Sequence, residues 1–496
     1  MPNKPGSPCM PPPVYLGQNY TTGLSVPNSR IGVRKADRTI WRLAKAFTSS
    51  IVYRQFEVIS VGELGSLTMS GCHLPDFMCG WVSGPNTRGT IDIIYSCLST
   101  IWLCTWTCLC LNIPDRHESG WRFLVYKFRW QAFAIFFPEV LVASAAEQWM
   151  SARQSVTAFN ALGFDHWSVR HGFFADMGGI MIAPRDGDCF PVNSCQLAYL
   201  VRHAYISLPQ LEMDDIRAVN KADGLARAFT LGQVIWFTLS CLGRATNDIS
   251  LTPLELETLA FILCTIHTFF FWYHKPLDPS RSIVVPLELN LSQLGVLNLD
   301  LNTYKRTPLE VIDPLPDPKS LVTPFWFGFR CVIEPFERAS SGPRRPHLTV
   351  PNSIANPPDG IGWMLTLYII FFQITYYGLH IGVGWLLPFP TTVEFYLWEG
   401  AGIVNAGLIA IYVIGLSLGS HFAPWIGKNI FHRDASTVLE VANMLPLWAK
   451  FFIHAPFVFT YLLARIVGLA STFSSLRALP VVAFQAVSWS NFLPHI

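Results

Sequence analysis

The most prominent pattern along the chain is a series of long apolar runs separated by polar, proline-containing stretches. A transmembrane helix needs about 20 mostly apolar residues to cross the hydrocarbon core of a bilayer. Seven runs approach that length, and each predicts one spanning helix. The expected fold class is therefore all-α, a polytopic transmembrane helix bundle. The predicted spans are residues 91–113, 130–146, 226–243, 254–273, 361–387, 397–418 and 448–470.

The segments between the runs divide the chain into a front part and a membrane part. Residues 1–85 are punctuated by proline, glycine and serine, which predicts a partly disordered, extramembrane N-terminal segment. Residues 86–496 form the predicted transmembrane helical domain, in which residues 276–360 are a proline-rich extramembrane loop. Residues 171–182 and 196–208 have the mixed character of interfacial or re-entrant pieces. Since the chain starts polar, without the apolar core of a signal peptide, the first span is expected to direct it to the membrane.

The composition supports a membrane location. Hydrophobic residues make up 51% of the chain and charged residues 14%, whereas soluble domains are nearer a quarter charged. The lipid bilayer is therefore an expected partner, in a multi-pass arrangement in the endoplasmic reticulum. The net charge of +2, without a basic patch interleaved with aromatic residues, argues against nucleic acid as a partner.

Basic residues give conflicting signs of orientation. The loop after the first span carries Arg116 and Arg122, which places that loop in the cytosol under the positive-inside rule. The proline-rich loop is then lumenal, and the sequon that begins at Asn290 is expected to be glycosylated. Lys428 and Arg433 in a later loop argue for the opposite orientation.

Several ionisable side chains fall inside the apolar runs or at their edges. A charged group in the hydrocarbon core is costly, so it usually faces the bundle interior or a wet cavity. Glu139 follows Pro138 inside the second run, where the proline frees a backbone carbonyl and so favours a polar pocket. The candidate acids and bases are Glu139, Asp176 and Glu147, with Asp92, His274, Glu394 and Glu399 in reserve.

Helix ends offer another explanation for some of the acids. Asp92 stands at the start of the first run, where it can cap the helix and pair with Arg88. Glu255 and Glu257 follow Thr252-Pro253, a dipeptide typical of a helix N-terminus, where first-turn acids are ordinary.

Helical spacing places further polar residues on shared faces. His267 and His274 are seven residues apart, although His274 alternatively sits at the water line. The other two sets are Gln373, Tyr377 and His380 in the fifth run, and Glu394, Trp398 and Asn405 in the sixth.

The segment from His171 to Gly179 has an acid, Asp176, five residues after the histidine and glycines on both sides. A carboxyl group in an aromatic pocket has a raised pKa and can donate a proton near neutrality. The segment therefore predicts a re-entrant piece, with an acid at Asp176 and a substrate contact at His171, or else a surface turn.

Aromatic residues are abundant, with 36 Phe, 17 Trp and 15 Tyr. They are typical of interfacial belts and helix packing, or of an aromatic-lined cavity for an apolar or cationic species. Under the second interpretation, the candidate wall residues are Trp102, Trp106 and Trp398.

Motifs for metals and phosphates are missing from the sequence. It has no Walker A motif, no glycine-rich dinucleotide fingerprint, no His-Glu-x-x-His helix and no Asp-Asp-x-x-Asp for magnesium. Cys97, Cys104, Cys108 and Cys110 share one apolar run without a zinc-ligand spacing. No metal and no cofactor is therefore expected, which leaves acid–base chemistry on an apolar substrate or no chemistry at all.

Several strings resemble a large group of fungal membrane proteins. Among them are Arg88-Gly-Thr-Ile-Asp92, Pro138-Glu139, Glu147-Gln-Trp, the segment from His171 to Gly179, and His274-Lys-Pro-Leu-Asp278. The resemblance covers most of residues 88–496. Some members of that group, or proteins near it, resemble the membrane terpene cyclases of fungal meroterpenoid clusters, such as the ascofuranone-type cyclase.

That resemblance implies a terpene cyclase that works without a metal. It would protonate an epoxide or olefin on a farnesyl chain attached to an aromatic head, and then guide ring closure. A prenylated aromatic small molecule is thus the implied substrate. Two other classes fit the same buried acids: a non-enzymatic transporter or lipid-binding sensor, and an acyltransferase that uses a membrane histidine such as His267 or His380.

Overall fold

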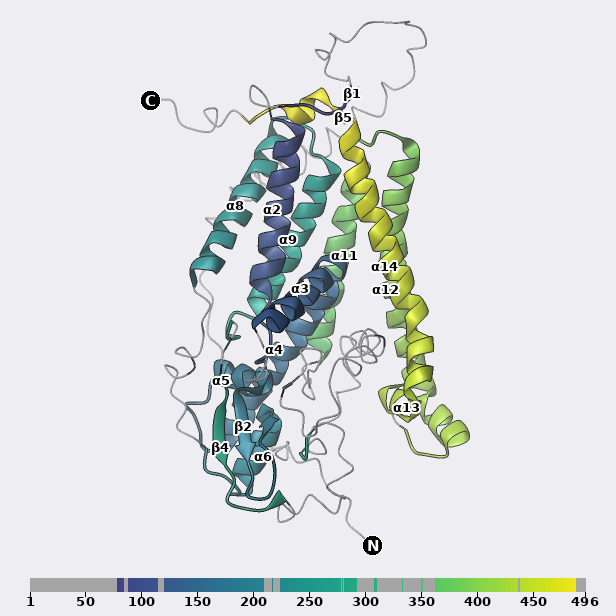
Figure 1. Ribbon diagram of the computed structural model, residues 1–496. Helices are drawn as coiled ribbons and strands as arrows, with labels where there is room; N and C mark the ends of the chain where they lie inside the picture. The colour runs from purple at the N-terminus through teal and green to yellow at the C-terminus, as the bar shows by residue number, and fades with distance from the viewer. Residues whose placement is uncertain are drawn as a thin grey trace, which may run out of the picture. The chain divides into compact units, whose positions relative to one another are not determined.

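The described chain is mostly helical, as the apolar runs predicted (Figure 1). The structure, a computed structural model, describes most of the chain after residue 77, and all the described residues belong to one compact unit. The described residues are 78–83, 88–114, 120–208, 216, 224–277, 279, 281–291, 307–309, 332, 349–350, 362–435 and 438–487.

Helices α2 (Thr90–Cys108), α8 (Gly224–Thr246) and α9 (Pro253–Phe271) pack against one another, with α2 in contact with both others (Figure 1). The buried face of α2 repeats at helical spacing and consists of small or branched side chains. Close packing follows, because such side chains let helix backbones approach one another. These residues are Ile93, Cys97, Thr100 and Cys104.

A second group contains α11 (Gly362–Gly384), α12 (Thr392–Ile426) and α14 (Leu447–Ser474). Helices α12 and α14 run side by side over much of their length (Figure 1). The π-turn η4 (Gly427–Phe431) and the short helix α13 (Val438–Met444) connect them. Helix α9 contacts both α11 and α14, so it joins the two groups.

The predicted second span is wrong as a single helix, because the chain breaks between α3 (Gly120–Phe136) and α4 (Pro138–Ala161). Proline has no N–H and disfavours helical geometry in the residue before it, so Pro138 begins a new helix instead of continuing the old one. Glu139 consequently lies in the first turn of α4 and not in the middle of a span.

Residues 171–182 and 196–208 were predicted as interfacial or re-entrant pieces, but they belong to a small mixed region. It contains α5 (Val169–Phe174), the π-turn η1 (Ala175–Gly179) and α6 (Ser194–Arg202). A three-stranded sheet in the order β3-β2-β4 accompanies them. The strands are β2 (Ile180–Ala183), β3 (Phe190–Val192), antiparallel to β2, and β4 (Ile283–Pro286), parallel to β2.

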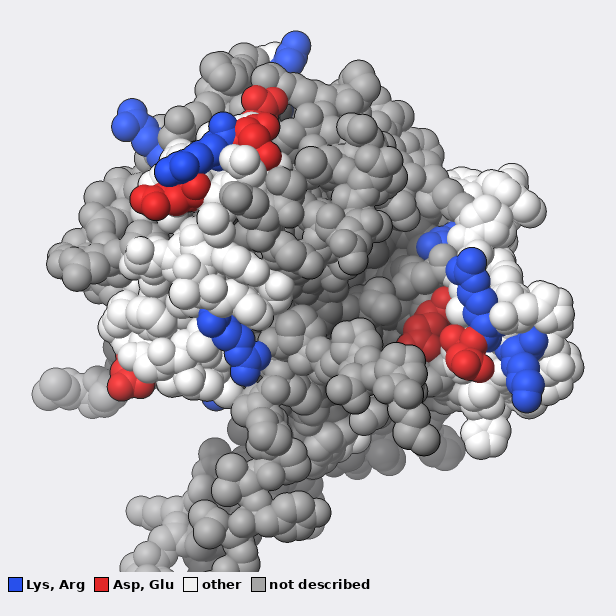
Figure 2. All heavy atoms as spheres, turned by 90° about the horizontal axis from the view of Figure 1, so that it is seen from below, with Lys and Arg blue, Asp and Glu red and all other residues white. Residues whose placement is uncertain are grey.

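This mixed region has its own hydrophobic core, which includes Phe174, Ile182 and Leu197. Strand β4 comes from the predicted proline-rich loop 276–360, so the start of that loop is ordered structure; most of its remainder lies outside the described residues. The same end of the molecule carries lysine, arginine, aspartate and glutamate side chains on its surface (Figure 2).

The far ends of the described chain meet in a two-stranded sheet. Strand β1 (Met78–Cys79) pairs antiparallel with β5 (Leu479–Pro480), which lies between the 3₁₀ turns η5 (Ser475–Arg477) and η6 (Val481–Phe484). Residues 78–79 fall in the predicted N-terminal segment 1–85, most of which lies outside the described residues.

Three helices among the described residues are long and apolar enough to cross a membrane: Thr90–Cys108, Pro253–Phe271 and Trp448–Arg477. They coincide with three of the predicted spans. Helices α8, α11 and α12 also coincide with predicted runs, but their crossing of the bilayer, and the count of seven, stay predictions.

Candidate functional site

Glu139 is a buried carboxylate held by two tyrosines from distant helices. Its side chain is 1% exposed. The Tyr377 hydroxyl on α11 donates to Oε1 at 3.0 Å, and the Tyr461 hydroxyl on α14 donates to Oε2 at 2.5 Å. Phe137, next to the break between α3 and α4, stacks on Tyr461 with ring centroids 5.5 Å apart. The start of α4 thus presents Glu139 to the interior of the bundle.

Glu257, in the early part of α9, forms a buried ion pair with Arg465 of α14. The Arg465 Nη2 atom lies 2.8 Å from Glu257 Oε1, and its Nη1 atom donates to the Tyr376 hydroxyl at 3.0 Å. The guanidinium carbon also lies 5.3 Å from the centre of the Phe261 ring. Removing either charge would leave the other without its partner in a low-dielectric interior.

His380 on α11 faces the same ion pair. Its Nδ1 atom lies 3.9 Å from Glu257 Oε2, and its ring stacks on Trp398 with centroids 3.8 Å apart. The Nε2 atom has no hydrogen-bond partner among the described residues, although the side chain is only 9% exposed. Buried polar atoms nearly always find a partner, so this nitrogen requires an explanation.

These side chains surround a pocket between α9, α11, α12 and α14. Small residues on α12 and α14, such as Ala401 and Gly468, also line it. Within the described chain, other buried polar atoms on the lining residues also lack a hydrogen bond, among them Asn405 Oδ1 and Arg465 Nε. The polar lining residues are Glu257, Tyr376, Tyr377, His380, Asn405 and Arg465.

The three preferred acids do not share this pocket. Glu139 reaches it through Tyr377, whereas Glu147 and Asp176 are not among its lining residues. Glu147 is 1% exposed and lies two turns after Glu139 on α4.

Asp176 lies in η1 of the mixed region, where it accepts hydrogen bonds from Ser151 Oγ and from the Ser194 N–H at the start of α6, both at 2.8 Å. Burial raises the pKa of the Asp176 carboxyl, and these hydrogen bonds oppose the rise. Its position thus connects α4, η1 and α6.

A buried lysine lies nearby at the end of α9. The Lys275 Nζ atom donates to Gln148 Oε1 at 2.8 Å and lies 4.4 Å from the centre of the Trp272 ring. Burial lowers the pKa of Lys275 to about 8, while Cys110 and Asp176 oppose the change.

Asp92 and Glu394 sit at helix ends. The exposed Asp92 caps α2 by accepting from the Gly89 N–H at 2.8 Å. Glu394, in the first turn of α12, accepts from Ser474 Oγ and pairs with Arg477 at 3.1 Å.

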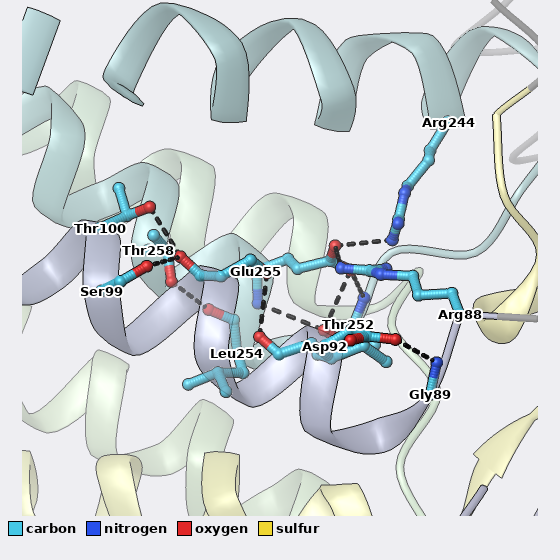
Figure 3. A network of polar contacts seen from close by, with 12 residues as sticks. Arg88, Gly89, Asp92, Ser99, Thr100, Arg244, Thr252, Leu254, Glu255 and Thr258 are labelled. Atoms are coloured by element: carbon cyan, nitrogen blue, oxygen red, sulfur yellow. Dashed lines mark hydrogen bonds and ion pairs between the residues drawn. The ribbon is translucent and has the colours of Figure 1, made fainter. Parts of the chain in front are cut away.

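The predicted Arg88–Asp92 pair is wrong, because Arg88 reaches Glu255 instead. The Arg88 Nη2 atom lies 2.7 Å from Glu255 Oε1, and Arg244 Nη1 lies 2.6 Å from the same oxygen (Figure 3). Glu255 also completes the cap at Thr252, as the sequence predicted. One carboxylate therefore ties together the ends of α2, α8 and α9.

The predicted shared face of His267 and His274 is wrong, because α9 ends at Phe271 and leaves His274 exposed beyond it. The Nδ1 atom of His267 lies 2.7 Å from the Leu263 carbonyl oxygen on its own helix. His171 completes the cap of α5, with Nδ1 2.8 Å from Ser168 Oγ.

The tryptophan candidates separate into two groups. Trp102 and Trp106 stack on each other on the outer side of α2, and Trp102 is 48% exposed, so neither lines the pocket. Trp398 is fully buried against His380. Glu399, next to it on α12, is 4% exposed, and neither of its carboxylate oxygens has a hydrogen-bond partner among the described residues.

Sequence reasoning gave too little weight to Glu257 and missed Arg465 and Tyr461. Glu257 looked like an ordinary first-turn acid. Arg465 did carry a signal, because a charged residue in the middle of the last apolar run calls for a buried partner.

A family model matches residues 67–297, and the family is described as one of unknown function (DUF8562). No curated protein and no solved structure matches the chain. The matched stretch contains Glu139 and Glu257, while His380, Asn405 and Arg465 lie beyond it.

Proposed function

We propose that the protein is a membrane terpene cyclase, which closes rings on a prenyl chain attached to an aromatic head. The observation that carries the proposal is the environment of His380. Its Nε2 atom lies in the pocket without a hydrogen-bond partner among the described residues, while Nδ1 faces the Glu257 carboxylate. A carboxylate behind an imidazole orients the ring and offsets part of the cost of protonating it in a buried site, as a general acid there requires.

The proposed reaction begins with proton transfer from His380 Nε2 to an epoxide oxygen of the substrate. The C–O bond breaks, its electron pair stays on oxygen as a hydroxyl, and positive charge develops on carbon. Electrons of a neighbouring double bond then form the new C–C bond, and loss of a proton from carbon ends the sequence. The product is an isomer of the substrate, so no co-reactant is consumed.

Several groups in the pocket lining have chemistry that such a substrate could use. The rings of Tyr376, Tyr377 and Trp398 provide π faces that stabilise a developing cation. Asn405 Oδ1 can accept a hydrogen bond from the aromatic head of the substrate. A prenylated phenol is itself a lipid, which accords with a proposed multi-pass location in the endoplasmic reticulum. The sequence resemblance to fungal membrane cyclases supports the same reaction class.

The test compares two histidine variants in membranes given an epoxyfarnesyl phenol. His380→Gln is expected to lower turnover about a hundredfold or more, the usual contribution of a general acid. His267→Gln is the matched control, because that histidine lies on neighbouring α9, outside the pocket lining, and its Nδ1 is engaged with its own helix. Wild-type turnover in His380→Gln would overturn the proposal.

The second candidate is a non-enzymatic transporter or lipid-binding protein. The buried Glu257–Arg465 pair between α9 and α14 favours it, because intramembrane ion pairs also mark transport paths. The same membranes distinguish the two candidates: a binding protein retains the phenol and returns it unchanged, whereas a cyclase returns a ring-closed isomer.

A further inference from the structure

Four buried ionisable side chains around the pocket form a cluster: Glu139, Glu257, His380 and Arg465. Its net charge is zero only when it carries one proton more than the state with a neutral histidine and two ionised carboxylates. The two carboxylates, Glu139 and Glu257, are 1% and 3% exposed, and the permanent cation Arg465 is 6% exposed. With His380 neutral and both carboxylates ionised, the cluster has a net charge of −1. A buried net charge is costly, so one more proton stabilises the cluster. With that proton the net charge of the cluster is zero.

Tyr377 connects the pocket, which His380 lines, to Glu139. Its side chain lines the pocket together with His380, and its hydroxyl donates to Glu139 Oε1 at 3.0 Å. Glu139 itself is not a lining residue, so it meets the pocket through this hydroxyl. Tyr461 holds the other carboxylate oxygen at 2.5 Å, which fixes the orientation of Glu139.

Two of the other pocket groups, Glu257 and Tyr376, are poor proton acceptors. Glu257 is engaged by the Arg465 guanidinium at 2.8 Å. The Tyr376 oxygen accepts a hydrogen bond from Arg465, and a neighbouring cation makes an oxygen less basic. Tyr377 differs from Tyr376 in facing a carboxylate.

Building on the proposed cyclase function, we infer that Tyr377, backed by Glu139, is the base that ends the reaction. The carbon next to the cationic centre gives its proton to the Tyr377 oxygen, and the C–H electron pair becomes a double bond. The hydroxyl proton of Tyr377 moves at the same time to Glu139 Oε1. One proton has then left His380 and one has arrived at Glu139, so the cluster is neutral before and after. The proton returns to His380 once the product leaves.

In this scheme Tyr377 is a catalytic residue and Glu139 is a positioning residue that acts through it. Without the base, the final cation persists until water captures it, so the product changes from an olefin to an alcohol. The ratio of olefin to alcohol therefore reports on the base, whereas the rate of epoxide consumption reports on the acid.

The experiment measures that ratio for Tyr377→Phe, with Tyr368→Phe as the matched control, because Tyr368 lies on the same helix α11 but outside the pocket lining. We expect the olefin share to fall at least fivefold in Tyr377→Phe while epoxide consumption persists, and to stay unchanged in Tyr368→Phe. Glu139→Gln is expected to behave like Tyr377→Phe, and Glu139→Asp to restore part of the olefin. Partial rescue by the shorter acid separates a proton-accepting role from a purely structural one.

Failure of the inference and failure of the proposed function are distinguishable. A wild-type olefin share in Tyr377→Phe overturns the terminal base but leaves the cyclase in place. No conversion by the wild-type protein overturns both. If Tyr377→Phe does not accumulate in membranes, the olefin shares of Glu139→Gln and wild type decide the matter, and equal shares overturn the inference.

Discussion

The indole of Trp398 lies nearly flat against the imidazole of His380, with ring planes 24° apart. The indole is anchored by its Nε1 atom, which donates to Thr472 Oγ1 at 3.0 Å. On α12, a Cβ atom added to Gly402 would lie 2.5 Å from His380 Cδ2. The imidazole is therefore confined between an aromatic face and a helix backbone, which keeps Nδ1 toward Glu257.

A methyl group at position 402 should displace this imidazole. Replacing glycine by alanine inside a helix normally stabilises the helix by roughly 0.5–1 kcal/mol. The Gly402→Ala protein can therefore fold, but its added methyl group would still displace His380. A displacement of about 1 Å can lower turnover about a hundredfold, and we expect a loss of that order. The control is Gly407→Ala on the same helix, where a Cβ atom meets nothing within 4 Å. Equal turnover in the two variants would show that the ring is not confined.

The network around Glu255 should be a major contributor to stability. Glu255→Gln removes the charge that faces Arg88 and Arg244, and breaking a buried ion pair costs about 3–5 kcal/mol. We expect a clear loss of thermal stability, measured as the fraction of detergent-solubilised protein that stays monodisperse after heating. Asp92→Ala, which removes the exposed cap of α2, should cost only about 1 kcal/mol. A larger loss in Asp92→Ala than in Glu255→Gln would contradict this ranking.

Asp176→Asn should affect stability and leave the chemistry intact. The carboxylate accepts one hydrogen bond on each oxygen, whereas an amide has a single acceptor oxygen, so one bond is lost at a cost of about 1–3 kcal/mol. Turnover per folded molecule should equal that of the wild type, because Asp176 does not line the pocket. A large loss of turnover with unchanged stability would return Asp176 to the catalytic group.

Lys275 should make stability depend on alkaline pH. Its pKa is lowered from 10.5 to about 8 in the folded protein, so the unfolded chain binds more protons between these values. Stability therefore rises as pH increases from 8 to 10.5, by up to about 3 kcal/mol. As pH rises over this range, the melting temperature of the wild type should rise relative to that of Lys275→Met, so the difference between them should narrow or change sign in favour of the wild type. The exposed Lys428→Met is the control, and parallel curves for Lys275→Met would contradict the prediction.

Local features of the fold could be predicted from the sequence. Apolar runs located three helices that, among the described residues, are long and apolar enough to cross a membrane, and Thr252-Pro253 marked the start of α9. Pro138 was misinterpreted, because the same residue can kink a helix or begin one, and only the surrounding packing decides. The short strands β2 and β4 lie far apart in sequence, so neither had a local partner that could indicate a sheet.

The candidate site depended on pairings that periodicity does not contain. A buried acid is visible in a sequence as a polar residue within an apolar run, and Glu139 was found in this way. Its partner Tyr461 is 322 positions away, and the partner of Glu257 lies on α14. Helical spacing predicts which residues of a helix face inward. It does not predict which residue of another helix each of them contacts.

The pairing of β1 with β5 has a consequence for biosynthesis. Met78 emerges from the ribosome long before its partner Pro480, so this strand has no partner while the intervening helices are being synthesised. The pairing of β1 can therefore form only after residue 480 has been made. A chain interrupted before residue 479 would retain most of the described helices but would lack the partner of β1.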